Sequence, residues 1–328
     1  MFRWLVSAGF LALPIGATIG VLLAIQALRS AHGQPPPFSG GDLGGDLPGT
    51  GVPRNRDSVQ MWCDEAYGFD PKSKGVNFIL NPNPWGWQKG DPGAQCMQVE
   101  YFGNKTYATP YSAPPFNITW QYTRATDPAK NVHGFPNAKL DSNKLPAQLG
   151  SITKMQVGVE WHMSLANDSA TAVSLTKSEV SAKQINANVA IDMFLHQDQA
   201  RSLSSEQASH EVMVWFADFG TDTWPIGKTA GADKGVKATQ TIGDATFELY
   251  AGQNSLQQTV LSWVSTTAVE TFNQSLTPLF DAIFALNDAS FPKKTDYLGY
   301  FAFGQETYWS PQNVTFSVPQ LAVNVETS

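Results

Sequence analysis

Short hydrophobic runs separated by turn-forming clusters limit how this chain can fold. From residue 59 onward the runs alternate apolar and polar residues or are rich in β-branched side chains, and the clusters between them read NPNPWG, KGDPGA, SAPP, TRATDPAKN and GKTAGADKG. A period of two is typical of strands with one buried face, and Gly, Pro, Asn and Asp form the turns between strands. The pattern predicts an all-β fold of antiparallel strands, as a sandwich or a barrel.

One segment, NQSLTPLFDAIFALNDAS, departs from this pattern. Its apolar residues recur at the spacing of one helix face: Leu276, Leu279, Phe280, Ile283, Phe284 and Leu286. Thr277 is the expected N-cap, and Pro278 suits the first helical position. Because an amphipathic helix must bury its apolar stripe, we expect this lone helix to pack on the outside of a sheet.

The charge balance argues against nucleic acid as a partner. The chain has 21 Lys and Arg against 28 Asp and Glu, a net charge of −7, and no basic stripe that would contact a phosphate backbone. Its ten Trp residues fit a neutral ligand on which aromatic rings stack. We expect neither a metal nor a cofactor, because the five histidines are scattered and no phosphate-binding Gly loop or G-x-S-x-G motif is present.

The N-terminus contains an uncharged span from Trp4 to Leu28, bounded by Arg3 and Arg29. This span is long enough to cross a bilayer and predicts a signal-anchor in residues 1–29. Small residues from Ser30 to Gly33 leave a cleaved signal peptide as the alternative. In both cases the rest of the chain is expected to be extracellular, either secreted or tethered to the outer face of the membrane.

A linker and one folded domain follow this segment. Residues 30–57 are too rich in Gly and Pro to form a core, so they are predicted to be a flexible stalk. Residues 58–328 are then the folded domain, long enough for a large β sandwich. We expect it to act as a monomer.

Cysteines and glycosylation sequons agree with export. Two cysteines, Cys63 and Cys96, suit one disulfide, which would close a loop of about 30 residues and contribute roughly 3–4 kcal/mol. Two separate buried thiols are the alternative. Five asparagines lie in N-x-S/T sequons: Asn104, Asn117, Asn167, Asn273 and Asn313.

The stretch SHEVMVWFADFG places a carboxylate within an apolar strand. At a period of two, Glu211, Met213 and Trp215 share one face, and Val212, Val214 and Phe216 share the other. A carboxylate beside large apolar side chains is costly unless it is paired or works in a cleft. The start HEVMV is not a zinc-protease motif, because Val214 stands where the second His is needed.

Two other predicted strands carry carboxylates on unusual faces. YLGYFAFGQETYWS places Ala302, Gly304 and Glu306 on one face, where the small residues leave room for a ligand. INANVAIDMFLH has Asp192 on a polar face and an apolar back. Two carboxylates with a third acidic residue nearby are the equipment of a retaining glycosidase, in which one attacks the anomeric carbon and the other protonates the leaving oxygen.

The chain also resembles glycoside hydrolase family 12. The family carries an E-[LIV]-M-[IV]-W strand, matched here by HEVMVWFADFG followed by WPIG, and an F-G-x-E strand, matched by FGQE about 90 residues later. The similarity extends in order through WCDEAYGF, NPWGW, AQCMQV, VHGFPNAKL, NANVAIDMF and FELYAGQN. This resemblance implies a β-jelly-roll of two antiparallel sheets with a concave substrate cleft, acting on cellulose-like β-1,4-glucans or xyloglucan.

The resemblance also implies roles for single residues. Glu211 would be the nucleophile, Glu306 the general acid/base and Asp192 the carboxyl that hydrogen-bonds the nucleophile. The sugar-contacting residues would be Asn83, Trp85 and Met213, and the family disulfide would join Cys63 to Cys96.

Three departures from the family pattern bear on substrate preference. Tyr67 follows CDEA, so the aromatic residue near the first cysteine is displaced; residues 164–183 form an insertion; and the usual TEPF reads QETY, followed by Trp309. A non-catalytic glycan-binding jelly roll is the alternative function, although a lectin has no need of two Glu residues flanked by small side chains.

Overall fold

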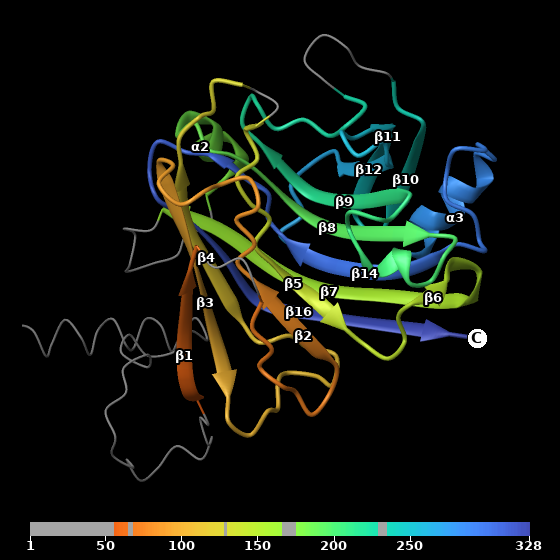
Figure 1. The fold of residues 1–328 in the computed structure, drawn as a ribbon, viewed down its shortest axis with the longest axis horizontal. Helices are drawn as coiled ribbons and strands as arrows, with labels where there is room; N and C mark the ends of the chain where they lie inside the picture. Colours follow the sequence, from red (N-terminus) through yellow and green to blue (C-terminus); the bar gives the residue numbers. More distant parts are fainter. Residues whose placement is uncertain (1–55, 65–67, 128–129, 166–174, 229–234) are drawn as a thin grey trace, which may run out of the picture. The chain divides into compact units, whose positions relative to one another are not determined.

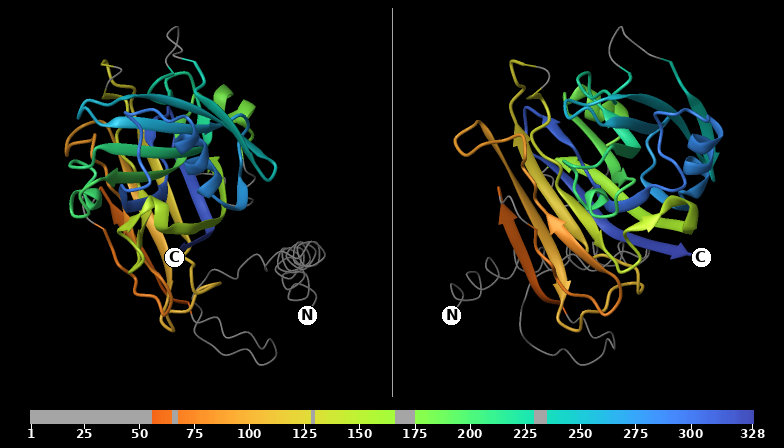
Figure 2. Two further views of the ribbon diagram at one scale, coloured as in Figure 1. Left: turned by 90° about the vertical axis from the view of Figure 1, so that its right-hand side faces the viewer. Right: turned by 45° about the vertical axis from the view of Figure 1, so that its right-hand side comes forward.

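Strand pairing divides the chain between two sheets that form separate layers (Figures 1 and 2). The computed structural model describes residues 56–64, 68–127, 130–165, 175–228 and 235–328. All of them belong to the compact unit Asn55–Ser328. The predicted signal-anchor and most of the predicted linker lie outside the described residues. Within the described ranges, no helix is long and apolar enough to cross a membrane.

The first sheet has six strands, in the order β1-β3-β4-β16-β7-β13, and every neighbouring pair is antiparallel. Its strands are β1 (Arg56–Cys63), β3 (Gly93–Phe102), β4 (Phe116–Tyr122), β16 (Val314–Thr327), β7 (Ile152–Leu165) and β13 (Thr271–Ser275). Cys63 and Cys96 are directly opposite each other on β1 and β3 and form a disulfide, so the predicted pairing is confirmed.

The second sheet has ten strands, eight of them in the order β10-β11-β12-β9-β8-β14-β5-β2, while β15 pairs with β8 and β6 with β14. The strands are β10 (Ala238–Ile242), β11 (Ala245–Gln253), β12 (Thr259–Ser265), β9 (His210–Phe219), β8 (Asn186–His196), β14 (Tyr297–Gly304), β5 (Asn137–Asp141), β2 (Asn77–Asn81), β15 (Thr307–Trp309) and β6 (Ala147–Gln148).

One pair in this second sheet corrects the prediction of purely antiparallel sheets. Strands β9 and β12 are parallel. Parallel neighbours need a long connection, and here β10 and β11 intervene in sequence between them. The predicted alternation along the strands is confirmed, because one face of each sheet points into the core between the two sheets.

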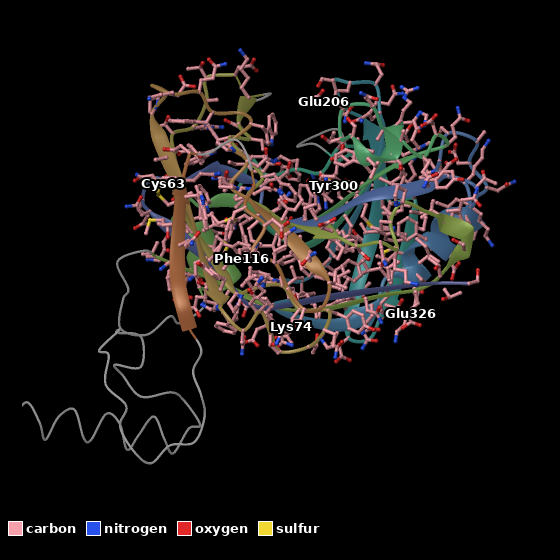
Figure 3. All side chains as sticks on the ribbon, turned by 60° about the horizontal axis from the view of Figure 1, so that its bottom comes forward. Cys63, Lys74, Phe116, Glu206, Tyr300 and Glu326 are labelled. Atoms are coloured by element: carbon pink, nitrogen blue, oxygen red, sulfur yellow. A yellow bond between two sulfur atoms is a disulfide. The ribbon has the colours of Figure 1, made fainter. Side chains whose placement is uncertain are left out.

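Strand β9 illustrates how the alternation builds the core. Val212, Val214 and Phe216 share one face, as predicted, and are fully buried in the main core between the sheets. Met213 and Trp215 point to the opposite face and are also buried. Phe116 of β4 contributes to the core from the six-stranded sheet, and Cys63 lies on the outer strand β1 (Figure 3). Strand β9 therefore has no ordinary solvated face.

The predicted helix is confirmed as α3 (Thr277–Ala285), which packs against β10 and β7. Leu279, Phe280 and Ile283 are its buried residues. The predicted N-cap is wrong: the N-cap position is Leu276, and the Thr277 hydroxyl pairs with Ser275 Oγ instead of a helix amide.

This helix is not alone. A second short helix, α2 (Lys177–Ala182), lies in the insertion, where a capping box between Thr176 and Glu179 begins it. Two 3₁₀ turns, η2 (Leu149–Ser151) and η3 (Arg201–Leu203), complete the helical elements of the described residues.

Candidate active site

Neighbouring strands of the ten-stranded sheet bring two of the predicted carboxylates to one face. Asp192 on β8 is paired with Met213 on β9 and with Ala302 on β14. Glu211 lies two residues before Met213 and therefore shares this face with Asp192. We call it the carboxylate face; it also carries a small apolar cluster, separate from the main core, of Ala190, Met213, Trp215, Tyr250 and Val264. Strands β8, β9 and β14 lie side by side and curve along their length (Figure 1).

Glu211 is at the start of β9 and is half-buried. Oε2 accepts a hydrogen bond of 3.2 Å from Asn254 Nδ2. Burial raises the pKa of Glu211 to about 7, and the hydrogen bond from Asn254 opposes this shift. A carboxyl with such a pKa can ionise under mildly acidic to neutral conditions and remain nucleophilic.

Glu306 occupies a different position from the one predicted. Strand β14 ends at Gly304, so Glu306 lies between β14 and β15 and not on the strand face of Ala302. Asn188 of β8 anchors it: the Glu306 backbone amide donates to Asn188 Oδ1 at 2.9 Å, and Asn188 Nδ2 donates to Glu306 Oε2.

The electrostatics of Glu306 connect it to Glu211. Burial and, after it, the charge of Glu211 raise the pKa of Glu306 to about 7, although the hydrogen bond from Asn188 opposes the rise. The structure thus brings the two glutamates within electrostatic reach of each other, although 94 residues separate them in sequence. A carboxyl that stays protonated near neutral pH can serve as a general acid.

Asp192 is the most deeply buried of the three carboxyls. It is 7% exposed, and its Oδ1 is buried without a hydrogen-bond partner. Burial raises its pKa strongly, followed by the charges of Glu211 and Glu306. The side chain is therefore held in its neutral, protonated form while a neighbouring carboxyl is ionised. The hydrogen bond to Glu211 that the family resemblance implies stays a prediction.

The three predicted sugar-contacting residues lie in two places. Met213 is on the carboxylate face, in contact with Trp215, whose Nε1 donates to Met213 Sδ at 3.4 Å. Asn83 and Trp85 lie in the loop after β2. Asn83 has a left-handed backbone with φ 46°, which Asn tolerates better than most residues, and its Nδ2 donates to the carbonyl of Phe135 at 3.2 Å.

Trp85 is 62% exposed, and its loop is tied to the segment that follows Glu306. The amide of Gly86 donates to the carbonyl of His133 at 3.0 Å, and the amide of His133 donates to the carbonyl of Thr307 at 2.8 Å. An exposed indole on an anchored loop suits a sugar-stacking platform. Trp87, two residues further on, is half-buried against the core, and its Nε1 donates to the carbonyl of Asp91.

Two residues that the sequence reasoning did not assign contact the carboxyls. They are Asn188 and Asn254. Asn188 and Asn254 lie within the family-like stretches NANVAIDMF and FELYAGQN, so a polar residue in each was the available signal. No local pattern indicates which carboxyl each of them meets, because each contact joins distant parts of the chain. Among the described residues, no group of three or more His, Cys, Asp or Glu side chains is arranged to hold a metal ion.

Comparison with known proteins places this arrangement among glucan hydrolases. Xyloglucan-specific endo-β-1,4-glucanase A of Emericella nidulans is 26% identical over 274 residues, covering 84% of this chain and 93% of the relative. Xyloglucan-specific endo-β-1,4-glucanase 1 of Phytophthora sojae is 29% identical over 204 residues, covering 62% and 69%.

Solved structures share the jelly-roll fold. Endoglucanase 3 of Trichoderma harzianum superposes with a TM-score of 0.60 at 21% identity, covering 82% of this chain and 98% of that one. A family 12 xyloglucanase from Bacillus licheniformis gives 0.56 at 15% identity, covering 81% and 100%. Residues 76–326 match the model of glycosyl hydrolase family 12, and because this match spans well over half of the sequence, the chain belongs to that family.

Proposed function

We propose that this protein is a retaining endo-β-1,4-glucanase with xyloglucan as its preferred polymer. The observation that carries the proposal is the pair of carboxyls, Glu211 and Glu306, which both have pKa values raised to about 7 and act on each other electrostatically. Xyloglucan is favoured over cellulose-like chains because the two curated relatives described above are named xyloglucan-specific.

The reaction proceeds in two displacements. Glu211 attacks the anomeric carbon, while Glu306 transfers its proton to the leaving glycosidic oxygen, so a covalent glycosyl-enzyme forms and one sugar chain leaves. Glu306, now ionised, takes a proton from water, which attacks the same carbon and releases Glu211. This mechanism requires carboxyl groups about 5–5.5 Å apart, and we expect that separation between Glu211 and Glu306.

The active enzyme needs one ionised and two protonated carboxyls. Because the three carboxyls are coupled, the first proton is expected to leave Glu211, while Glu306 and Asp192 stay protonated. Asp192 holds its proton most strongly because it is the most buried. The active form is therefore expected from mildly acidic to neutral pH.

Substrate binding is assigned to the carboxylate face, with Met213 beside the nucleophile. Trp85 is the proposed outer platform, because its exposed indole can stack on a glucosyl ring. Asn83 is assigned a hydrogen bond to sugar. Its Nδ2 uses one N–H on the carbonyl of Phe135, so the second N–H and the side-chain oxygen can bind a sugar hydroxyl.

The decisive experiment is a side-by-side assay of the purified protein on xyloglucan, carboxymethyl-cellulose and mixed-linkage β-glucan. We expect release of oligosaccharides from xyloglucan with a rapid fall in viscosity, and proton NMR should show the β-anomer forming first. Glu211→Gln should abolish release while the protein still binds the polymer. Binding by the wild type without release of sugar would instead identify a non-catalytic glycan-binding protein.

We further propose that the protein is exported and glycosylated on the six-stranded sheet. All four described sequon asparagines are in or next to strands of that sheet: Asn104 after β3, Asn117 in β4, Asn273 in β13 and Asn313 just before β16. Asn117 also lines a hollow of about 340 Å³ on this sheet, together with Glu100, Pro115, His162, Ser317, Val318 and Pro319. Glycans at these positions leave the carboxylate face open.

The proposed domain plan is a signal-anchor or signal peptide in residues 1–29, a linker in residues 30–57 and the catalytic domain in residues 58–328. Mass spectrometry of glycopeptides from the native host tests the sequons, including Asn167. Fractionation tests the anchor: a protein found only in the medium, with an N-terminus after Leu28, would identify a cleaved signal peptide.

A further inference from the structure

Trp309 lies three residues after the proposed acid/base and outside the apolar core. The residue is half-buried, but in the part of the chain that the structure describes it belongs neither to the main core nor to the small cluster on the carboxylate face. It also ends the stretch QETYW, which departs from the family pattern TEPF. Core packing therefore does not explain why an indole stands here.

A salt bridge fixes this indole in place. Trp309 Nε1 donates to Asp222 Oδ2 at 2.9 Å. Arg124 holds the same carboxylate with two nitrogens of its guanidinium group: Nε lies 2.6 Å from Oδ2, and Nη2 donates to Oδ1 at 3.0 Å. The guanidinium carbon also lies 5.7 Å from the centroid of the Trp309 ring. We call these three side chains the Arg124 unit.

The backbone around the Arg124 unit is fixed as well. The Asp222 amide donates to Asn186 Oδ1 at 2.9 Å, and Trp309 is paired with Asn186 across β15 and β8. Gly220 lets the loop after β9 come this close, because its φ is 88° and a Cβ atom there would lie 2.1 Å from Asn186 Oδ1. Because the unit is held without a ligand, little side-chain entropy is lost when a ligand binds.

The Arg124 unit lies on the carboxylate face, next to Glu306. Asn186 and Asn188 are two residues apart on β8, so their side chains point to the same face. Asn188 holds Glu306, and Asn186 holds the loop of Asp222. Two residues of a strand span about 7 Å, so the unit and Glu306 are neighbours along β8.

The positions of the two glutamates indicate how a glucan crosses this face. Glu211 is opposite Phe194 on β8, while Glu306 is bound to Asn188 of the same strand, so the line between the glutamates runs along β8. Because the nucleophile and the acid/base flank the scissile bond, the glucan backbone crosses the strands between them. The Arg124 unit lies beyond Glu306 on this line. It is therefore beside the glucan backbone, where substituents project.

The chemistry of the Arg124 unit suits a neutral sugar. Asp222 neutralises the guanidinium group, so the unit has no net charge. Arg124 uses Nε and Nη2 on this carboxylate, whereas its Nη1 has no hydrogen-bond acceptor among the described residues, and the side chain is 59% exposed. Nη1 can therefore donate to sugar hydroxyls, and the exposed part of the Trp309 indole can contact the apolar side of a sugar ring.

We propose that Arg124 and Trp309 form a binding site for a branch sugar of the glucan, and that this site favours xyloglucan over unbranched β-glucan. The inference rests on the proposed function, because it names the part of the substrate that sets the preference. Arg124 Nη1 donates to hydroxyls of the xylosyl branch, the indole of Trp309 packs against its ring, and Asp222 positions both side chains.

The test compares Arg124→Met with Lys154→Met on xyloglucan and on mixed-linkage β-glucan, which has no branches. Lys154 is a matched control, because it is also an exposed cation paired with a carboxylate, that of Glu326 at 3.9 Å, but on the six-stranded sheet. Arg124→Met keeps the stem of the side chain and removes the donors. The ratio of kcat/KM on xyloglucan to kcat/KM on mixed-linkage β-glucan should therefore fall about tenfold. Trp309→Ala should lower this ratio about 3–10-fold, and Lys154→Met should leave it unchanged.

A binding measurement separates recognition from catalysis. In the Glu211→Gln background, calorimetry gives the Kd of a xyloglucan oligosaccharide and of the cello-oligosaccharide with the same backbone length. Adding Arg124→Met should raise the Kd of the branched ligand about tenfold more than that of the unbranched ligand. Thermal unfolding of each variant checks that the fold is retained.

Equal losses on the two polymers in Arg124→Met would overturn the inference, because a salt bridge with only a structural role affects every substrate alike. An unchanged ratio without any loss would overturn it too. A wild type that cleaves no β-glucan would refute the proposed function, whereas the calorimetric comparison of branched and unbranched oligosaccharides still decides whether the branch site exists.

Discussion

Asn254 donates a hydrogen bond from Nδ2 to Glu211 Oε2 over 3.2 Å, joining the end of β11 to the start of β9. Asn254 is itself held by its turn, because its Oδ1 accepts from the backbone amides of Leu256 and Gln258, both at 3.0 Å. Gln258 is buried and donates to the carbonyls of Ser205 and Ala208. The carboxyl of the proposed nucleophile is thus oriented by a network that reaches into the loop before β9.

Removing this contact should shift the acidic limb of activity. In Asn254→Ala the ionised form of Glu211 loses a hydrogen bond, so the pKa of Glu211 rises above its wild-type value. We expect the acidic limb of kcat/KM to move upward by about 0.5–1 pH unit and activity at pH 5 to fall 3–10-fold. The measurement is a pH profile of kcat/KM on xyloglucan.

Asn324→Ala is the matched control, because Asn324 makes the same kind of bond to Glu326 Oε1 at 2.9 Å on β16. It should leave the profile unchanged. A uniform fall in the Asn254→Ala rate at every pH, with no movement of the limb, would show that Asn254 supports only the turn.

Activity should survive Asp192→Asn better than Asp192→Ala. Its strongly raised pKa means that the neutral form is the native one, and Asn copies the shape and donor capacity of that form. Asp192→Asn is expected to retain kcat/KM within about tenfold of wild type at pH 6, while Asp192→Ala should lose at least a further tenfold because it removes the hydrogen bond expected from residue 192 to Glu211. Steady-state kinetics of both variants, with Tm as a check on folding, make the comparison. Equal losses in the two variants would argue against a hydrogen bond from residue 192 to Glu211.

The raised carboxyl pKa values predict a stability that falls with rising pH. The pKa of Glu211 is about 7 in the folded chain and about 4.3 in the unfolded chain. Above about pH 4.5 the unfolded state therefore binds fewer protons than the folded state, and the free energy of unfolding falls as the pH rises. The stabilising contribution is complete below the unfolded pKa and is lost as pH rises through about 7. Glu211→Gln cannot ionise, so its free energy of unfolding relative to wild type should increase by on the order of 2 kcal/mol between pH 4.5 and 7.5.

Chemical denaturation of wild type and Glu211→Gln at several pH values measures this difference. Glu206→Gln is the control, because Glu206 is an exposed residue of the loop before β9 (Figure 3). A difference between Glu211→Gln and wild type that stays constant with pH would contradict the predicted titration.

Trp85→Ala should weaken binding without slowing the chemical step. The indole is 62% exposed, so little packing is lost, whereas stacking on a sugar contributes about 1 kcal/mol. KM for xyloglucan is expected to rise about 3–10-fold, with kcat and Tm unchanged. Met61→Ala on β1 removes a side chain that is also 62% exposed and should change none of these values. An unaltered KM in Trp85→Ala would remove this residue from the binding surface.

Local sequence patterns were enough for the strand alternation, for helix α3 and for the face on which Glu211 lies. The alternation in HEVMVWF correctly divided Val212 and Val214 from Met213, because side-chain direction in a strand depends only on parity along the chain. Helix α3 was predicted for a similar reason, since its stripe follows from helical spacing. The N-cap of the helix was predicted wrongly as Thr277, because the Thr277 hydroxyl pairs with Ser275 Oγ and not with a helix amide.

What only the tertiary structure decided is how distant segments meet. The parallel pairing of β9 with β12 joins residues far apart in sequence, and so do the contacts of Asn254 with Glu211 and of Asn188 with Glu306. The position of Glu306 beyond the strand face of Ala302 depends on where β14 ends. The raised pKa values have the same origin, because desolvation sums over every group packed around a carboxyl, from whichever strand it comes. A sequence therefore determines which side chains are available and which way each one faces locally, while the packing of the sheets determines which of them share a proton.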